Sequence, residues 1–284
     1  MKINNFWRLH MDPEALSNPI LLALPTGAKV AVFQVGRGPD LIYLPGSNVD
    51  YRLRPGVFTS RLPEFFRVTT LEHRGLARST GPNGLWKMQD FADDVLQIMS
   101  ALGIKSASLL GESFGAMVAQ WVALTSPELF SRVAYACGSV GGLAGSSFPF
   151  HDWLERSPME RAREVLLHVN LGNREIEAND PDKFEEMLNG RLIFEQQFLA
   201  NLAQREGYRY LLEARAKHDC SASISSLSMP IWIMAGQQDG IAPIANQRAM
   251  ARLLPSSHFK EFDGGHDFLW SSQHPIDWLL REWA

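Results

Sequence analysis

Hydrophobic positions along the chain fall into two kinds of run. Short apolar or alternating runs, bounded by glycine, proline or polar residues, are typical of strands in a sheet. They predict strands at residues 29–35, 40–44, 67–72, 106–110, 132–137, 230–235 and 257–262. Apolar residues at helical spacing predict helices at 87–102, 114–126, 244–254 and 274–283. Because strands alternate with helices, we expect an α/β fold with a mostly parallel sheet and helices on both of its faces.

The strand pattern stops between residues 143 and 219. Runs such as 159–167 and 194–199 indicate helices there, and the segment holds 14 acidic and 10 basic residues. The whole chain has a net charge of −4, so this segment carries the entire excess of acid. We expect most of these charges on a solvated outer face; a weak field that repels anionic substrates is the alternative.

The sequence Gly-Glu-Ser-Phe-Gly at 111–115 joins a predicted strand to a predicted helix. Gly-x-Ser-x-Gly in that context is typical of a nucleophile elbow, a tight turn that strains the serine backbone and leaves its hydroxyl accessible. The helix that follows would direct its positive N-terminal end at an anion formed on Ser113. An ordinary glycine-rich turn is the alternative, and the rest of the sequence must distinguish the two.

A serine hydroxyl needs a general base, and the base needs an orienting carboxylate. Asp239 lies in a turn just past the predicted strand 230–235, and His266 lies in a glycine-rich loop after the strand 257–262. The chain order Ser113, Asp239, His266 is the order of the triad in α/β hydrolases.

These segments resemble the α/β hydrolase family over almost the whole chain. Residues 41–48, Leu-Ile-Tyr-Leu-Pro-Gly-Ser-Asn, occupy the place of the family's oxyanion loop. Residues 72–79, Glu-His-Arg-Gly-Leu-Ala-Arg-Ser, are similar to its Asp-x-Arg-Gly-x-Gly-x-Ser turn. Three residues depart from the family pattern: Pro45 replaces histidine, Glu72 replaces aspartate and Ala77 replaces glycine.

The resemblance implies the α/β hydrolase fold with a helical cap inserted after the sixth strand. The cap would span 143–219, between core segments 1–142 and 220–284. By the same analogy the backbone amides of Ser47 and Phe114 would form the oxyanion hole. The turn at 72–79 is structural in the family, where its arginine packs beside the oxyanion loop.

Other candidates for the acid are weaker. Asp263 and Asp267 flank His266 too closely in sequence to reach its Nδ1 easily. The position after the strand 132–137, which carries the acid in some family members, reads Cys-Gly-Ser-Val and has no carboxylate. Glu112 is expected to point to the opposite side of the turn from Ser113, in a packing or supporting role.

The remaining histidines lack a catalytic context. His73 is expected to be structural or to face solvent. Three histidines of the 143–219 segment could line a pocket but are expected at the surface or in packing: His151, His168 and His218. Neither His10 nor His258 lies in a motif, and His274 precedes Pro275 at the start of the last helix, where it would cap the helix or face solvent.

Composition narrows the classes of protein further. With 45% apolar and 20% charged residues, the 284-residue chain is typical of one large globular domain, and a pI near 6.1 argues against nucleic-acid binding. Cys137 and Cys220 fit neither a metal motif nor an expected disulfide, so we expect no metal and no cofactor. The N-terminus lacks the apolar run of a secretory signal, and the apolar stretches are too short to span a bilayer. We therefore expect a cytoplasmic protein with no membrane partner.

Two classes of function follow. The first is a serine hydrolase that acts on a small ester, lactone or thioester with an apolar acyl part; carbon–carbon bond hydrolases of diketones and acyltransferases use the same triad. The second is a non-catalytic binding protein, which would have no reason to keep all three residues. Haloalkane dehalogenases and epoxide hydrolases are excluded because their elbow carries aspartate as the nucleophile.

Overall fold

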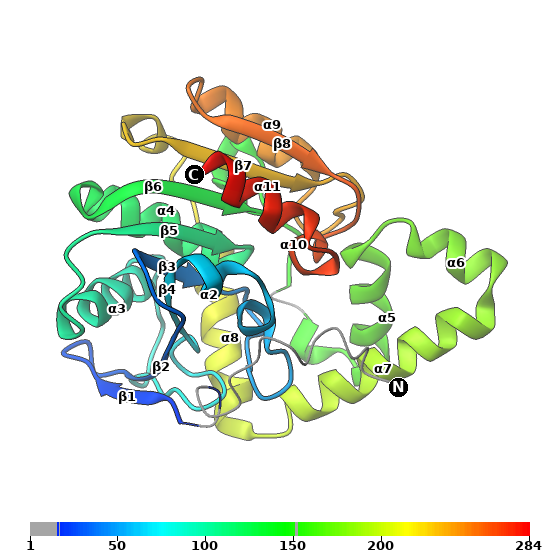
Figure 1. The fold of residues 1–284 in the computed structure, drawn as a ribbon. Helices are drawn as coiled ribbons and strands as arrows, with labels where there is room; N and C mark the ends of the chain where they lie inside the picture. Colours follow the sequence, from blue (N-terminus) through cyan, green and yellow to red (C-terminus); the bar gives the residue numbers. More distant parts are fainter. Residues whose placement is uncertain (1–15, 17, 151–152) are drawn as a thin grey trace.

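The computed structural model describes residue 16 and residues 18–150 and 153–284. Within them, eight strands form one sheet in the order β1-β2-β4-β3-β5-β6-β7-β8 (Figure 1). The antiparallel pairs are β1 with β2 and β2 with β4; all other neighbours are parallel. The strands are β1 (Ile20–Ala23), β2 (Lys29–Val35), β3 (Asp40–Leu44), β4 (Arg67–Leu71), β5 (Ala107–Glu112), β6 (Phe130–Ala136), β7 (Ile231–Gly236) and β8 (His258–Phe262).

The seven predicted strands are confirmed, with ends that shift by two residues at most. The edge strand β1 was not predicted. Three of its four residues are exposed, so no face of it produces a hydrophobic pattern. Its extended conformation comes instead from pairing with β2, where Ile20 lies opposite Val32.

The predicted core helices are also confirmed, each within one residue. The helices of the core are α2 (Leu62–Phe65), α3 (Met88–Ala101), α4 (Phe114–Thr125), α9 (Ile244–Leu253), α10 (Phe268–Ser271) and α11 (His274–Glu282). No helix in the described part of the chain is long and apolar enough to cross a membrane.

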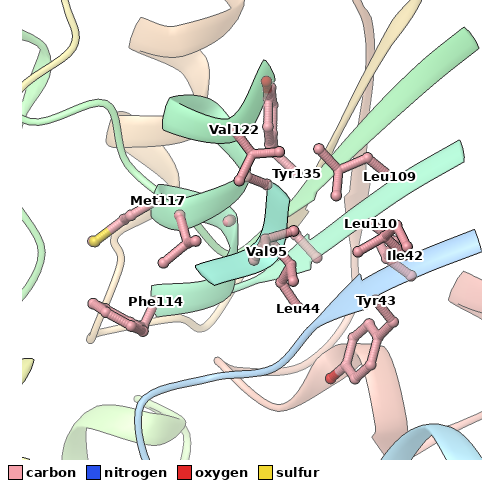
Figure 2. Close-up of a cluster of buried hydrophobic side chains, with 14 of the residues drawn as sticks. Ile42, Tyr43, Leu44, Val95, Leu109, Leu110, Phe114, Met117, Val122 and Tyr135 are labelled. Carbon is pink, nitrogen blue, oxygen red and sulfur yellow. The ribbon is translucent and has the colours of Figure 1, made fainter. Parts of the chain in front are cut away.

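Helices cover both faces of the sheet. α4 packs against β3, β5 and β6 and lies beside α3; Figure 2 shows its side chains in a buried cluster with those of the strands. The ring of Tyr43 on β3 points away from this cluster and packs edge-on against Trp270 of α10, with the ring centroids 5.5 Å apart. Since successive side chains of a strand point to opposite faces, α4 and α10 cover opposite faces of the sheet.

The described residues between β6 and β7 form four α-helices, in the stretch where the sequence indicated helices: α5 (Pro158–Val169), α6 (Asn173–Asn179), α7 (Pro181–Phe198) and α8 (Leu202–Ala216). Figure 1 shows α5, α6 and α7 projecting to one side of the sheet, while α8 returns beside it. Leu166, Leu167 and Phe184 form a small hydrophobic cluster of their own within this segment. A capping box between Ser157 and Glu160 begins α5, and the Asp180 side chain caps α7.

The turn at 72–79 has a structural role, as expected, and its charged residues form ion pairs. The carboxylate of Glu72 is fully buried, pairs with Arg78 at 2.7 Å and accepts a hydrogen bond from the Tyr51 amide. Arg74 forms a buried ion pair of 2.6 Å with Asp94 of α3. These pairs fix the turn from two sides.

The contact with the oxyanion loop is made by His73. This histidine is buried, and its Nε2 donates a hydrogen bond of 2.8 Å to the carbonyl oxygen of Pro45. Burial lowers the pKa of His73 to about 4, so the ring is neutral near pH 7. The expectation of a structural role for His73 is confirmed.

Ala77, which stands where the family pattern has glycine, has a strained backbone. Ala77 has a φ of 50°, a left-handed conformation that costs a residue with a side chain roughly 1–2 kcal/mol. Ala77→Gly should remove this cost from the folded state. Glycine also makes the unfolded chain more flexible, which offsets part of the stabilisation. The free energy of unfolding should therefore rise by about 0.5–1 kcal/mol. Urea denaturation followed by tryptophan fluorescence measures the change.

The matched control is Ala249→Gly in the middle of α9, where the backbone is helical. That variant should lose about 0.5–1 kcal/mol, because glycine is unfavourable inside a helix. Loss of stability in both variants would contradict the assignment of strain to Ala77.

Candidate active site

Ser113 lies on a tight turn between β5 and α4, with φ 54° and ψ −116°. Two glycines make the turn possible. A Cβ on Gly111 would lie 2.5 Å from the carbonyl oxygen of Gly115, and a Cβ on Gly115 would lie 2.0 Å from that of Leu44. Any other residue would collide with backbone that cannot move aside. The turn therefore has the strained geometry that the sequence predicted for an elbow.

Ser113, His266 and Asp239 form a continuous chain of hydrogen bonds. Ser113 Oγ lies 2.7 Å from His266 Nε2, and His266 Nδ1 lies 2.8 Å from Asp239 Oδ2. The other carboxylate oxygen of Asp239 accepts hydrogen bonds of 2.8 Å from the amides of Ile241 and Ala242. Three residues far apart in the sequence thus meet at one point, and the orientation of the buried carboxylate is fixed by the loop that carries it.

The environment of His266 favours its protonated form. Burial alone would lower the pKa of His266, but the negative charge of Asp239 and its hydrogen bond outweigh burial, and Glu112 adds to them. The net effect is a raised pKa. A proton taken up by the ring would therefore be stabilised by the carboxylates around it.

The loops that carry Asp239 and His266 both contact the C-terminal end of α5. The amide of Gly240 donates to the carbonyl of His168 at 2.9 Å, and the amide of His266 donates to that of Val169. Gly265 packs so closely that a Cβ there would lie 1.9 Å from the Val169 carbonyl oxygen. The helical segment between β6 and β7 therefore helps to hold the positions of Asp239 and His266.

The loop after β3 lies against Ser113. A Cβ on Gly46 would lie 3.6 Å from Ser113 Cβ, and Ser47 lines the same cavity as Ser113. Phe114 is the first residue of α4, and its ring packs edge-on against His73 at a centroid distance of 5.0 Å. Ser47 and Tyr208 of α8 line the cavity together, and the Ser47 side chain lies close enough to Tyr208 to affect its pKa. Both residues predicted for the oxyanion hole thus lie next to Ser113.

A cavity of about 660 Å³ opens at Ser113 and His266. This volume is within the roughly 300–1,000 Å³ typical of small-molecule sites. The helical segment contributes an apolar part of the wall: Phe150, Trp153, Leu154, Val165 and Val169. Charged side chains also line the cavity: Arg54, Glu112, Arg161, Arg191, Glu195 and Asp267.

The sequence profile of the α/β hydrolase fold family matches residues 44–273. The chain belongs to the α/β hydrolase family. It is 25% identical over 232 residues to a putative carbamate hydrolase, RutD, of Klebsiella pneumoniae, a match that spans 78% of this chain and 82% of that protein. It is 26% identical over 232 residues to 3-oxoadipate enol-lactonase 1 of Acinetobacter baylyi, spanning 80% of this chain and 82% of that protein.

Solved structures agree on the fold of this hydrolase. A 2-hydroxy-6-oxo-6-phenylhexa-2,4-dienoate hydrolase from Rhodococcus sp. strain RHA1 superimposes with a TM-score of 0.73 at 18% identity. The match covers 93% of this chain and 98% of that one. The sequence prediction of fold and enzyme class is confirmed at this level.

The prediction of where the Glu112 side chain points was wrong. Its carboxylate lines the same cavity as Ser113 and accepts hydrogen bonds from the hydroxyl of Tyr43 and, at 2.7 Å, from Nε1 of Trp270. The side chain takes this direction because Tyr43 on β3 and Trp270 on α10 present donors to it. Neither donor is adjacent in sequence, so no local pattern could indicate the contact.

The other histidines that the structure describes do not join the hydrogen-bonded chain of Ser113, His266 and Asp239. His218 is buried, accepts from Trp121 Nε1 at 3.1 Å and donates to the Ser139 carbonyl, and burial lowers its pKa to about 4. His168 packs on Phe148, His258 stacks on Trp232, and His274 packs edge-on against Phe262. His10 and His151 lie outside the described residues.

Cys137, Asp239 and His266 are the one group in the described chain whose ligand atoms could surround a metal ion, all within 4.8 Å of one another. The geometry suits a metal poorly. Burial raises the pKa of the Cys137 thiol well above its usual value, and His266 Nδ1 already bonds Asp239. Both cysteines, Cys137 and Cys220, are free and buried.

The close packing at Gly265 can be tested directly. Gly265→Ala places a methyl group against the Val169 carbonyl, so α5 or the His266 loop must shift, at a cost of about 1–3 kcal/mol in the free energy of unfolding. Gly190→Ala on α7, where a Cβ would meet open space, should instead gain about 0.5–1 kcal/mol. Urea denaturation of both variants gives the comparison, and equal stability of Gly265→Ala and the parent would rule out the contact.

Proposed function

We propose that this hydrolase cleaves a small ester, lactone or thioester through an acyl-enzyme on Ser113. The observation that carries the proposal is the unbroken hydrogen-bonded chain from a strained Ser113 through His266 to the buried Asp239. The substrate is a small molecule, because the cavity at Ser113 holds about 660 Å³. The substrates named for the relatives differ from one another, so they support the reaction class rather than a particular substrate.

The proposed reaction has two halves. Ser113 Oγ attacks the acyl carbon while His266 Nε2 takes its proton, and the same proton then passes to the leaving group. Water next attacks the acyl-enzyme, gives a proton to His266, and Ser113 recovers that proton as the acid departs. Asp239 holds Nδ1–H of His266 and stabilises the imidazolium in both halves.

The amides of Ser47 and Phe114 are proposed to bind the oxyanion. The Phe114 amide is at the N-terminus of α4, where backbone N–H groups have no partner one turn earlier and the helix dipole favours negative charge. The hydrogen bond from His73 to the Pro45 carbonyl restrains the loop that carries the second amide, and Tyr208 lies against Ser47 on the same loop. Prior restraint of the donors lowers the reorganisation needed when charge develops.

Residues 143–219 are proposed to act as the cap over a core of residues 1–142 and 220–284. Their apolar side chains line the cavity beside Ser113, which supports a substrate with an apolar acyl part. Phe184 instead packs within the helical segment. The aromatic residues of the segment are therefore divided between substrate contact and internal packing.

Carbon–carbon bond hydrolysis and acyl transfer use the same three residues and stay as alternatives. Turnover of a vinylogous diketone faster than of aryl esters would favour the first, and transfer of the acyl group to an added alcohol or thiol in preference to water would favour the second. A binding protein without catalysis would give neither result.

The role of Ser113 predicts covalent labelling. A fluorophosphonate probe should add one equivalent to the protein by intact mass, and peptide mapping should place the adduct on Ser113. Ser113→Ala should abolish the adduct, and His266→Ala should slow esterase turnover by roughly 10³–10⁶. Labelling of folded protein at another residue would refute the assignment.

The pKa of His266 predicts the pH profile. Because the base must be unprotonated, kcat/KM should rise with pH through the pKa of His266, and the raised pKa places this rise above the ordinary histidine value of 6.5. Asp239→Asn removes the charge that raises the pKa, so the rise should move to lower pH while the plateau falls by about 10⁴. Glu112→Gln should also move the rise to lower pH, by less. A rise that stays in place in both variants would contradict this electrostatic account.

A further inference from the structure

Three arginines line the cavity: Arg54, Arg161 and Arg191. Three carboxylates line it as well: Glu112, Glu195 and Asp267. Glu195 is shared: it pairs with Arg191 four residues earlier on α7 and, at 3.4 Å, with Arg161 on α5. Two of the arginines therefore share one carboxylate.

Arg54 has no carboxylate partner among the residues that the structure describes. Its guanidinium carbon lies 5.3 Å from the ring centroid of Phe194, and that of Arg191 lies 4.8 Å from the same ring. Two like charges thus flank one aromatic side chain. Burial and, next, the charge of Arg191 lower the pKa of Arg54, while the charges of Glu112 and Asp267 raise it. The residue as a whole is exposed, so its guanidinium group is accessible to a ligand.

Arg191 also has a donor without an acceptor. Its Nε is buried and has no hydrogen-bond partner in the described chain. Leaving a buried donor unpaired is unfavourable, and more so when the group is charged. A protein keeps such a group at a cavity wall when a ligand supplies the acceptor, because the same donors then give affinity and selectivity.

Carboxylates of the same lining act on both groups. The charge of Glu112 raises the pKa of His266, and the charges of Glu112 and Asp267 also raise the pKa of Arg54. These carboxylates would repel an anionic group of the substrate that the guanidinium groups do not hold.

We propose that the substrate carries a carboxylate that Arg54 and Arg191 bind. This inference rests on the proposed function and adds its substrate class. A guanidinium group presents paired donors that match the two oxygens of a carboxylate. The apolar side chains of the helical segment contact the carbon chain between the carboxylate and the reacting carbonyl.

The proposal reverses an alternative that the sequence left open. The acidic excess of residues 143–219 could have implied a field that repels anions. The segment instead directs Arg161 and Arg191 at the cavity, and most of its carboxylates lie on exposed or partly exposed positions outside it. Placement of the charges, rather than their sum, determines the field at the site.

The test compares two substrates that differ in one charge. One is the mono-4-nitrophenyl ester of a linear six-carbon diacid, and the other is the same ester with its free carboxyl methylated. In wild type, kcat/KM for the anionic ester should exceed that for the methylated ester by at least about tenfold. Arg54→Gln should reduce this ratio of kcat/KM values by about tenfold to a hundredfold, which is the effect of losing a hydrogen bond to a charged group. Arg54→Lys should restore part of the preference.

Arg52→Gln is the matched control. Arg52 lies two residues away on the same loop, pairs with Asp50 at 2.7 Å and does not line the cavity, so its loss should leave the ratio unchanged. A second measurement does not depend on turnover. Binding of the free six-carbon diacid to Ser113→Ala should change the fluorescence of Trp153 and Trp270, which line the cavity. The Kd from this titration should be at least about tenfold weaker when Arg54→Gln is added.

The outcomes separate the two proposals. Hydrolysis of both esters at equal rates, with a ratio insensitive to Arg54→Gln, would overturn the carboxylate site and leave the serine hydrolase intact. Failure to hydrolyse either ester, together with no fluorophosphonate adduct, would overturn the proposed function itself. Tighter competition by an alkyl phosphate of equal length than by the diacid would overturn the choice of carboxylate.

Discussion

The close approach of backbone to backbone at the end of β5 is the constraint on which the site depends. Gly111 and Gly115 allow the turn and the first turn of α4 to lie against each other and against the end of β3. This contact forces Ser113 into a left-handed φ of 54°, a strain that the buried sheet and α4 must offset. The same contact brings the loop after β3 to Ser113, so the proposed nucleophile and oxyanion loop are positioned by one piece of packing.

The helical segment is coupled to this arrangement through its backbone. The last carbonyls of α5 accept hydrogen bonds from the loops of Asp239 and His266, and α8 reaches Ser47 through Tyr208. A shift of α5 would therefore change the geometry of the hydrogen-bonded chain as well as the shape of the cavity. Substrate binding and reaction geometry are linked because they share these contacts, which is the arrangement expected where binding energy is used to orient reacting groups.

The sequence predicted the parts of the structure that local chemistry specifies. The elbow requires glycines at fixed positions, and the loops of Asp239 and His266 follow strands with strong apolar patterns, so each could be found from its own segment. The direction of Glu112 could not, because it depends on donors from β3 and α10. The pairing of β1 depends on a partner strand, and its exposed residues give no pattern. Arg54 resembles any surface arginine in sequence, since its environment arises only when α7 folds over the loop that carries it.

The charges of the cavity link proton transfer to the proposed binding of an anionic substrate. Asp239 and Glu112 both raise the pKa of His266, which stabilises the imidazolium that forms when Ser113 loses its proton. The same negative charge would repel an anionic substrate. The proposed carboxylate site offsets this repulsion, because the guanidinium groups of Arg54 and Arg191 lie against the same Phe194 ring. Glu112 acts on both groups, since its charge raises the pKa of His266 and that of Arg54. The carboxylate that supports proton transfer therefore also influences the group proposed to bind the substrate.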